Sequence, residues 1–276
     1  MLNFSVDASR CTRCGLCAAD CPSRIITQAG DDVPAIRPDQ EPLCIRCQHC
    51  LAICPTGAVS ILGKRPEQSL PLSADSFPEF AQMALFLRGR RSVRRYRDAD
   101  VDRALIRDLL AALANVPTGV NAQKLTFAII DSRAVMRRLR AEALAALQAA
   151  AAAGRIPARF RYLQEAPAAF AERQDDILFR GAPHALIVSA PPDAPCPGED
   201  VVLALAYFDL LAHSARLGTV WWGMLKMILE LLPELKPSFG LAPRQRHYYG
   251  MLFGIPAVHY PRCVQRDEAA RIRRVE

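Results

Sequence analysis

The chain has 276 residues, 51% of them hydrophobic and 23% charged, with a formal net charge of +7. This length allows two domains, and this composition can bury a core without disulfides, which excludes a small disulfide-stapled scaffold. The first residues lack the pattern of a secretory signal, and the most apolar stretch, 201–212, is too short to span a bilayer. We expect a cytoplasmic protein with no membrane partner.

The positive charge is concentrated in one part of the chain. Basic and acidic residues nearly balance over 1–65, and the surplus begins with six arginines between 88 and 97. A single dense cluster is more typical of a bound phosphate than of a nucleic-acid track, which needs repeated backbone contacts. We therefore expect no nucleic-acid partner.

Eight of the ten cysteines lie in two runs with identical spacing, C-x2-C-x2-C-x3-C-P. The first run is Cys11, Cys14, Cys17 and Cys21, and the second is Cys44, Cys47, Cys50 and Cys54. Three thiolates on a tight loop can reach three corners of a cubane, while the proline after the fourth directs that thiolate to another cluster. Tetrahedral zinc gives no reason for the third cysteine of each run, and a dithiol redox site does not need eight. The spacing predicts iron–sulfur clusters.

This segment, 1–65, resembles a bacterial two-cluster ferredoxin. The resemblance implies that Cys11, Cys14, Cys17 and Cys54 hold one [4Fe–4S] cluster, and that Cys44, Cys47, Cys50 and Cys21 hold the other. Gln48 departs from the glycine often found in the second loop, and we expect its neighbour His49 to be a solvent-facing loop residue.

The proline- and serine-containing segment 66–80 reads as a linker, and 81–276 has the patterns of a second domain. Apolar periodicity predicts an amphipathic helix over 102–115 and a helix buried on all sides over 199–217, with Gly218 as its C′ glycine. Short apolar runs predict strands at 126–130, 185–189 and 249–253. The alanine-rich run 141–154 is expected to be a peripheral helix.

Two segments around the helix at 102–115 carry groups that suit a phosphate-bearing cofactor. Arg90, Arg91, Ser92 and Arg94 offer several charge-assisted donors to one phosphate before this helix. The segment 117–123 follows it, and there small residues allow close backbone approach while Asn121 and Gln123 offer donors and acceptors.

The order of these motifs resembles the nitroreductase family of FMN proteins. The later pieces are Arg216, Leu217 and Gly218 after the buried helix, and a glycine-containing strand that leads to Tyr260, Pro261 and Arg262. The resemblance covers nearly all of 81–276. It implies an α+β chain in which the ferredoxin module precedes a nitroreductase-like domain, with a central sheet flanked by helices, and it implies a homodimer.

The resemblance also implies roles for individual residues. Arg90, Ser92 and Arg94 would hold the FMN phosphate and ribityl chain, with Arg91 beside them. Arg262 and Arg266 would complete the phosphate site. Thr118, Asn121 and Gln123 would meet the isoalloxazine ring, in this family often across a dimer interface. The backbone at Leu217 and Gly218 would lie against the flavin.

Other candidate residues receive plainer interpretations. Lys124 and Leu125 depart from the residues usual after Gln123 and leave the shape of the substrate pocket open. Cys196 and Cys263 lack partner cysteines at ligand spacing, and His184 and His213 are expected to be structural. We expect no obligatory catalytic side chain.

The two halves together predict an oxidoreductase that passes electrons through two [4Fe–4S] clusters to FMN and reduces a small organic acceptor, such as a nitroaromatic, a quinone or an activated alkene. The donor would be an external ferredoxin-like electron carrier or NAD(P)H. The chain has no G-x-G-x-x-G or P-loop to indicate a dedicated dinucleotide or NTPase domain. Two alternatives remain open: a non-catalytic electron carrier or redox sensor, and a basic nucleic-acid-binding iron–sulfur protein.

Overall fold

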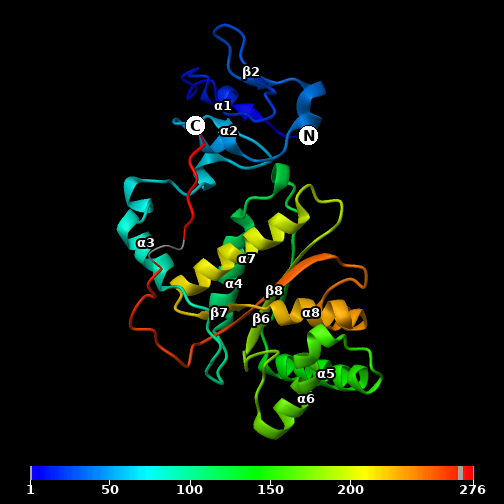
Figure 1. Ribbon diagram of the computed structural model, residues 1–276. Coiled ribbons are helices and arrows are strands. Elements are labelled where there is room, and N and C mark those ends of the chain that lie inside the picture. The colour runs from blue at the N-terminus through cyan, green and yellow to red at the C-terminus, as the bar shows by residue number, and fades with distance from the viewer. Residues whose placement is uncertain (1, 267–269, 276) are drawn as a thin grey trace. The chain divides into compact units, whose positions relative to one another are not determined.

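The computed structural model describes residues 2–266 and 270–275. It divides into two compact units (Figure 1). The first comprises Met1–Pro78 together with Val120–Ala122, and the second comprises Glu79–Gly119 and Gln123–Glu276. Among the residues described, no helix is both long and apolar enough to cross a membrane.

The first unit is built from two antiparallel strand pairs and two short helices. β1 (Ser5–Val6) pairs with β4 (Val59–Ser60), and β2 (Ile26–Thr27) pairs with β3 (Ala35–Ile36). The helices are α1 (Leu16–Ala19) and α2 (His49–Ala52), one in each cysteine run. Isoleucines, leucines and a valine in or near the strands and helices form the core, and two cysteines, Cys17 and Cys50, are buried with them.

The repeat in the sequence is also a repeat in the backbone. Gly15 precedes α1 with φ 71°, and Gln48 precedes α2 with φ 61°, so both occupy the left-handed region. Arg13 and Arg46, two residues earlier in each run, both have φ 59°. The second run therefore keeps the same tight turn without glycine, which accounts structurally for Gln48.

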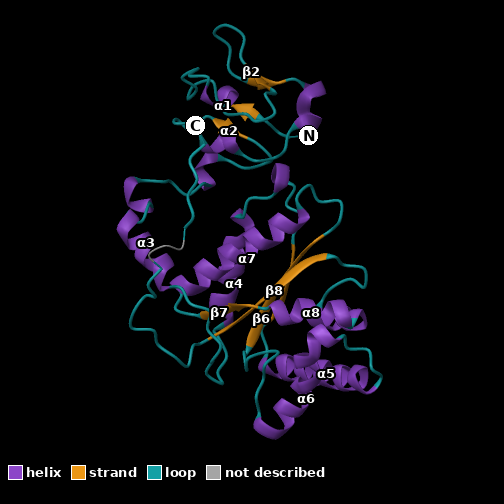
Figure 2. Ribbon diagram, viewed as in Figure 1, coloured by secondary structure: helices purple, strands orange, loops and turns teal. Residues whose placement is uncertain are grey.

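A four-stranded antiparallel sheet in the order β5-β6-β8-β7 forms the centre of the second unit (Figure 2). Its strands are β5 (Thr126–Ile130), β6 (His184–Ala190), β7 (Gly218–Trp221) and β8 (His247–Gly254). β6 is buried at every position because it lies between two strands and under helices on both faces.

Alternate residues of β6 enter two separate cores. Leu186 and Val188 pack with α4 and α7, whereas Ala185 and Ile187 pack with α5, α6 and α8. The helices of this unit are α3 (Phe80–Gly89), α4 (Arg103–Ala112), α5 (Arg133–Ala152), α6 (Arg161–Arg173), α7 (Pro197–Ser214) and α8 (Gly223–Leu231). The Asp102 side chain caps α4 by accepting from the N–H of Ala104 at 2.9 Å.

Most of the predicted elements are confirmed. The strand at 126–130 has the predicted bounds, and α4 continues as a 3₁₀ turn to Asn115. The alanine-rich helix starts earlier than predicted and is not merely peripheral, because Leu139, Ala143 and Leu147 are fully buried in the core. The segment expected to be a linker contains two short 3₁₀ helices, Pro66–Gln68 and Ala74–Ser76.

The predicted end of the buried helix is wrong. α7 stops at Ser214, and Arg216 with φ 59° takes the left-handed position, while the N–H of Leu217 donates to the carbonyl of Ala212 at 2.9 Å. Gly218 is instead the first residue of β7. Its lack of a side chain serves a close contact with Val93, since an added Cβ would lie 2.7 Å from that side chain.

Candidate functional site

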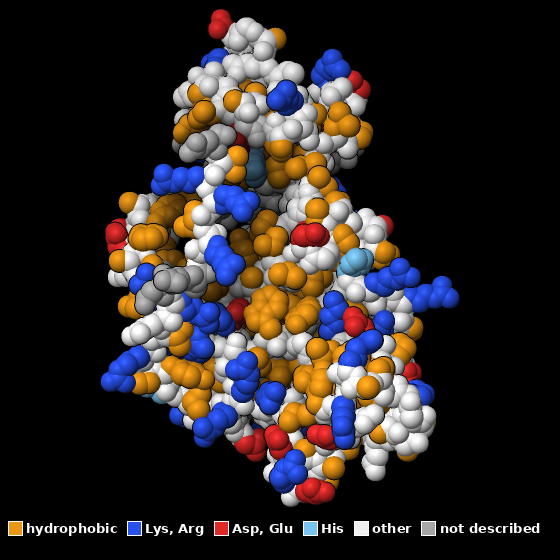
Figure 3. All heavy atoms as spheres, viewed as in Figure 1, with side chains coloured by type: hydrophobic (Ala, Val, Ile, Leu, Met, Phe, Trp, Pro, Cys, Tyr) orange, Lys and Arg blue, Asp and Glu red, His pale blue; other side chains and the backbone are white. Residues whose placement is uncertain are grey.

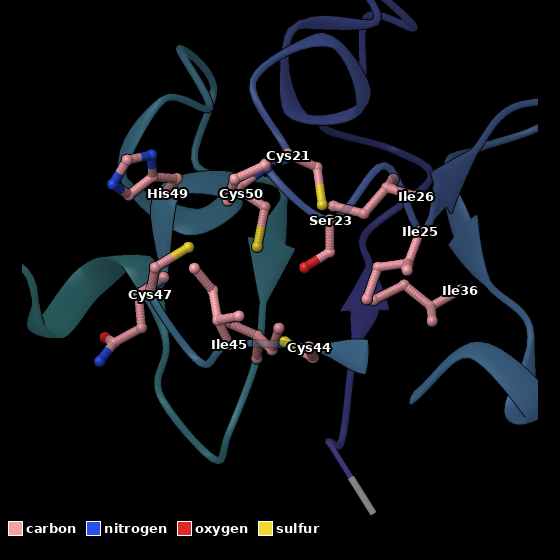
Figure 4. Close-up of a pocket in the computed structure, with 13 residues that line it drawn as sticks. Cys21, Ser23, Ile25, Ile26, Ile36, Cys44, Ile45, Cys47, His49 and Cys50 are labelled. Atoms are coloured by element: carbon pink, nitrogen blue, oxygen red, sulfur yellow. The ribbon is translucent and has the colours of Figure 1, made fainter. Parts of the chain in front are cut away.

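The first unit contains a small cavity lined by Cys11, Cys14, Cys17 and Cys54. A second small cavity is lined by Cys21, Cys44, Cys47 and Cys50, whose sulfurs point into the same space (Figure 4). Each cavity therefore combines three cysteines of one run with the fourth cysteine of the other. The role of these thiols as iron ligands stays a prediction.

The environment of the thiols differs from one position to the next. Burial raises the pKa of Cys50 to about 11, and burial also raises the pKa of Cys17. Burial opposes ionisation of Cys54 too, but the N–H of Ala58, 3.2 Å from its sulfur, helps to lower the pKa of that thiol. The N–H of Arg46 donates to the sulfur of Cys44 at 3.4 Å. Such N–H contacts are the kind that tune cluster potentials.

His49 is exposed, as expected, but it is the first residue of α2 and not a loop residue. Its Nδ1 lies 3.2 Å from the Oδ2 of Asp20, and its ring points away from the cysteine cavity (Figure 4).

In the second unit, the segment 90–94 is fastened to the edge strand β7. The N–H of Val93 donates to the carbonyl of Thr219 at 2.8 Å, and Ser92 forms a parallel bridge with Thr219. This pairing brings the arginine-rich segment against the start of β7, where Gly218 leaves room for Val93.

A cavity of about 600 Å³ opens beside this contact. It is lined by Arg91 and Val93 from the segment, by Arg216 and Gly218 near the end of α7, and by residues that follow β8, including Tyr260. No Asp or Glu stands among the described residues that line it. The cavity is therefore cationic with partly aromatic walls, which suits an anionic ligand.

Two rings lie at one side of this cavity. Phe86 and His213 face each other with ring centroids 4.7 Å apart. Burial lowers the pKa of His213, which favours the neutral imidazole. Because His213 also lines the cavity, its assignment as a structural residue stays a prediction.

The arginines of the segment do not share one cavity. Arg91 lines the large cavity, whereas Arg94 lines a smaller one of about 250 Å³ together with Arg180 and Trp221. The Nη1 of Arg90 lies 3.5 Å from the Oδ2 of Asp209, and it is buried without a hydrogen-bond partner among the described residues. Sequence reasoning expected all three arginines at one phosphate, and it did not single out Arg180 or the side chain of Arg216.

The second predicted flavin segment is held in place by hydrogen bonds. The N–H of Gly119 donates to the Oδ1 of the buried Asp200 at 2.9 Å, and the N–H of Gln123 donates to the hydroxyl of Thr118 at 3.0 Å. Asn121 belongs to the first unit, where its amide donates to the carbonyl of Ile45 at 2.9 Å. Neither Thr118 nor Gln123 lines the large cavity or the smaller cavity that Arg94 lines.

The remaining candidates lie apart from the cavities. Arg262 and Arg266 are exposed in the segment after Tyr260, and Cys263 is exposed as well. His184 is fully buried, its Nε2 accepts from the N–H of Val101 at 3.0 Å, and burial lowers its pKa. Its surroundings are those of a structural histidine, as expected. Cys196 is half-buried beside Gly119, at the start of α7.

Comparison with known protein families decides the identity of the second unit. Residues 87–255 match the model of the nitroreductase family. The chain belongs to the nitroreductase family. In this family member, residues 3–55 additionally match a 4Fe-4S dicluster domain, which confirms the ferredoxin-type module predicted from the cysteine spacing.

Solved structures share the fold of this nitroreductase-family chain at low identity. A nitroreductase with bound FMN from Bacteroides fragilis is 19% identical, with a TM-score of 0.56 over 70% of this chain and 99% of that chain. One with bound FMN from Desulfitobacterium hafniense is 21% identical, with a TM-score of 0.55 over 71% and 98%. An FMN-dependent nitroreductase from Mycobacterium smegmatis, in complex with NADPH, is 23% identical, with a TM-score of 0.50 over 71% and 100%. No curated protein matches the chain. The predicted α+β fold with a nitroreductase-like domain is confirmed.

Proposed function

We propose that this chain is an FMN- and iron–sulfur-dependent oxidoreductase that reduces a small organic acceptor: a nitroaromatic, a quinone or an activated alkene. One observation carries the proposal. A nitroreductase fold with a cationic cavity of about 600 Å³ is joined, in a single chain, to a module with two cavities that are each lined by four cysteines.

The chemistry of the cysteine cavities fits two [4Fe–4S] clusters. Each cavity offers four thiols, and no Asp or Glu stands among the described residues that line it. The set Cys11, Cys14, Cys17 and Cys54 would hold one cluster, and the set Cys21, Cys44, Cys47 and Cys50 would hold the other. The surrounding isoleucines shield the second set from water and so influence its potential (Figure 4).

The large cavity fits the phosphate-bearing end of FMN, which the solved relatives named above contain. Its volume lies in the range of cofactor pockets, and Arg91 and Arg216 supply guanidinium donors. Arg90, whose Nη1 is paired with Asp209, lies between the lining residues Gly89 and Arg91 and would be a further source of positive charge. The backbone at Leu217 and Gly218 can approach a ligand closely because Gly218 has no side chain.

When bound, the clusters would supply single-electron transfer and FMN would supply reduction of the acceptor. The chain's own residues would bind the cofactor and orient the acceptor. The rings of Phe86 and Tyr260 provide apolar walls, and Arg91 and Arg216 stabilise negative charge in the cavity. The proposal requires no side chain as an obligatory acid or base.

The proposed ring contacts need a second copy of the chain. Thr118 and Gln123 do not line the large cavity of their own chain, so they would reach a flavin from the partner subunit of a homodimer. Asn121 would act with them. Arg94, Ser92, Arg262 and Arg266 complete the proposed cofactor contacts.

Anaerobic turnover tests this function. The purified chain is supplied with either NAD(P)H or a reduced ferredoxin and with a nitroaromatic, a quinone or an activated alkene. We expect multiple turnovers with at least one donor–acceptor pair. Replacing Cys54 by Ser should abolish turnover driven by ferredoxin, whereas the matched Cys196→Ser variant, outside both cysteine cavities, should retain it. A bound flavin that no donor can reduce would contradict the proposal and favour a non-catalytic electron carrier or redox sensor.

A further inference from the structure

We propose that Asp209, a buried acid in α7, is a positioning residue that orients the guanidinium of Arg90 toward a flavin phosphate. The inference rests on the proposed function. It assigns a role in cofactor selection to an acid inside the apolar stretch 201–212.

Asp209 is buried in apolar surroundings. It is 5% exposed, and Leu205, Phe208 and Ala212 on the same helix are fully buried. A carboxylate in such a place is costly unless it is paired and hydrogen-bonded. Asp209 has both kinds of partner, because the hydroxyl of Thr219 donates to its Oδ1 and Arg90 approaches its Oδ2.

The contact with Asp209 holds the Arg90 side chain by charge at one nitrogen of its guanidinium. Its Nη1 stands 3.5 Å from the carboxylate and makes no hydrogen bond to any described residue. The flanking residues Gly89 and Arg91 both line the large cavity. Arg90 itself is not among the described lining residues, but it stands between two that are, and 29% of its side chain is exposed.

Thr219 connects the carboxylate to the arginine-rich segment by a second route. Its hydroxyl binds Asp209, and its carbonyl accepts from the N–H of Val93. Asp209 therefore influences both the guanidinium of Arg90 and, through Thr219, the backbone three residues further along. This arrangement orders the segment before the phosphate arrives, which reduces the entropy that is lost on binding.

A matched acid on the same helix offers a control. Asp200 is 3% exposed and accepts from the N–H of Gly119, at the segment that carries Thr118. If Asp209 acts through Arg90 on a phosphate, replacing Asp209 should weaken the binding of FMN. It should leave the binding of riboflavin, which has the same ring without the phosphate, nearly unchanged. Replacement of Asp200 should affect both flavins equally.

The test is a flavin titration on full-length protein with its clusters retained and its FMN removed under anaerobic conditions. FMN and riboflavin are titrated separately by flavin fluorescence into wild type, Asp209→Asn, Arg90→Gln, the double variant and Asp200→Asn. We expect Asp209→Asn to weaken FMN binding by about tenfold or more, because a charge-assisted contact is lost. The affinity for riboflavin should change by less than about twofold. In the Arg90→Gln background, Asp209→Asn should have no further effect on the FMN to riboflavin ratio.

Three results would overturn the inference: equal weakening of both flavins by Asp209→Asn, tighter FMN binding by that variant, or additive effects in the double variant. If Asp209→Asn does not fold, Thr219→Val replaces it, and an unchanged FMN to riboflavin ratio in that variant would also count against the inference. Failure of the proposed function is a separate outcome, because wild type would then bind neither flavin.

Discussion

Replacing Gly218 by Ala should loosen the edge at which the arginine-rich segment meets β7. An added Cβ would lie 2.7 Å from the Cβ and Cγ1 of Val93 and 2.8 Å from its Cγ2, whereas ordinary contacts begin at 3.4 Å. The overlap of about 0.6–0.7 Å cannot be relieved by rotating Val93, because a β-branched side chain is stiff at χ1 and Val93 is 6% exposed.

The expected cost is that of overpacking a buried site, about 1–3 kcal/mol of unfolding free energy. For a unit of this size, each kcal/mol lowers the melting temperature by about 2–4 °C. Both tryptophans, Trp221 and Trp222, belong to the second unit, so their fluorescence follows its unfolding. FMN content should fall together with stability, since the same edge borders the large cavity.

Two variants make this reasoning refutable. Gly198→Ala, in the first turn of α7 with nothing within 4 Å of its added Cβ, should be neutral or stabilising by up to about 1 kcal/mol. In a Val93→Ala background, which itself costs about 1–2 kcal/mol, Gly218→Ala should lose most of its effect. Equal stability of the two glycine variants, or an undiminished penalty in the Val93→Ala background, would refute the steric argument.

Three further predictions concern the cofactor sites and the core. Cys17→Ser and Cys54→Ser should each remove about half of the iron, and the double variant should lose no more, because both residues line one cavity. Combining Cys17→Ser with Cys50→Ser should remove nearly all of the iron, because these residues line different cavities. Arg216→Gln should weaken FMN binding about tenfold in a fluorescence titration, and unchanged affinity would remove Arg216 from the proposed site. Burial lowers the pKa of His184 below its usual 6.5, so its neutral form stabilises the fold above pH 6.5 and that contribution is lost as pH falls through the lowered pKa. The stability advantage of wild type over His184→Gln should therefore shrink from about pH 8 to about pH 5 in denaturant titrations, and a constant difference would contradict the assignment.

The sequence predicts elements best where their burial leaves a periodic pattern. Strand β5 and helix α4 follow directly from apolar spacing. Helix α3 was missed because its apolar residues do not face a core: Phe80 is 86% exposed and Leu85 is 63% exposed. Helix α6 was missed for another reason, since it contains Pro167, which ordinarily interrupts a helix.

The candidate site shows the same division between local and non-local information. The repeated cysteine spacing is a local signal, and the fold places the two runs so that they contribute to common cavities. The arginine cluster is also local, but neighbouring side chains of a short segment leave in different directions, so Arg91 and Arg94 line different cavities. The sequence analysis did not single out Asp209, although an acid inside an apolar helix is a signal that could have identified it, because such residues are seldom buried unless paired.

Among the described residues, the face drawn in Figure 3 presents no continuous basic surface. On the face drawn in Figure 3, Lys and Arg side chains are scattered among apolar and acidic ones. The charge that concerns a phosphate is local to the large cavity, where Arg91 and Arg216 stand without an Asp or Glu among the described lining residues.

Cofactor stoichiometry tests the central claim most directly. Protein purified without oxygen is analysed for iron, acid-labile sulfide and flavin per polypeptide. Two cubanes and one flavin predict about eight irons, about eight sulfides and about one FMN for each chain. A preparation that keeps its fold but contains neither the iron nor the flavin at these ratios would contradict the account.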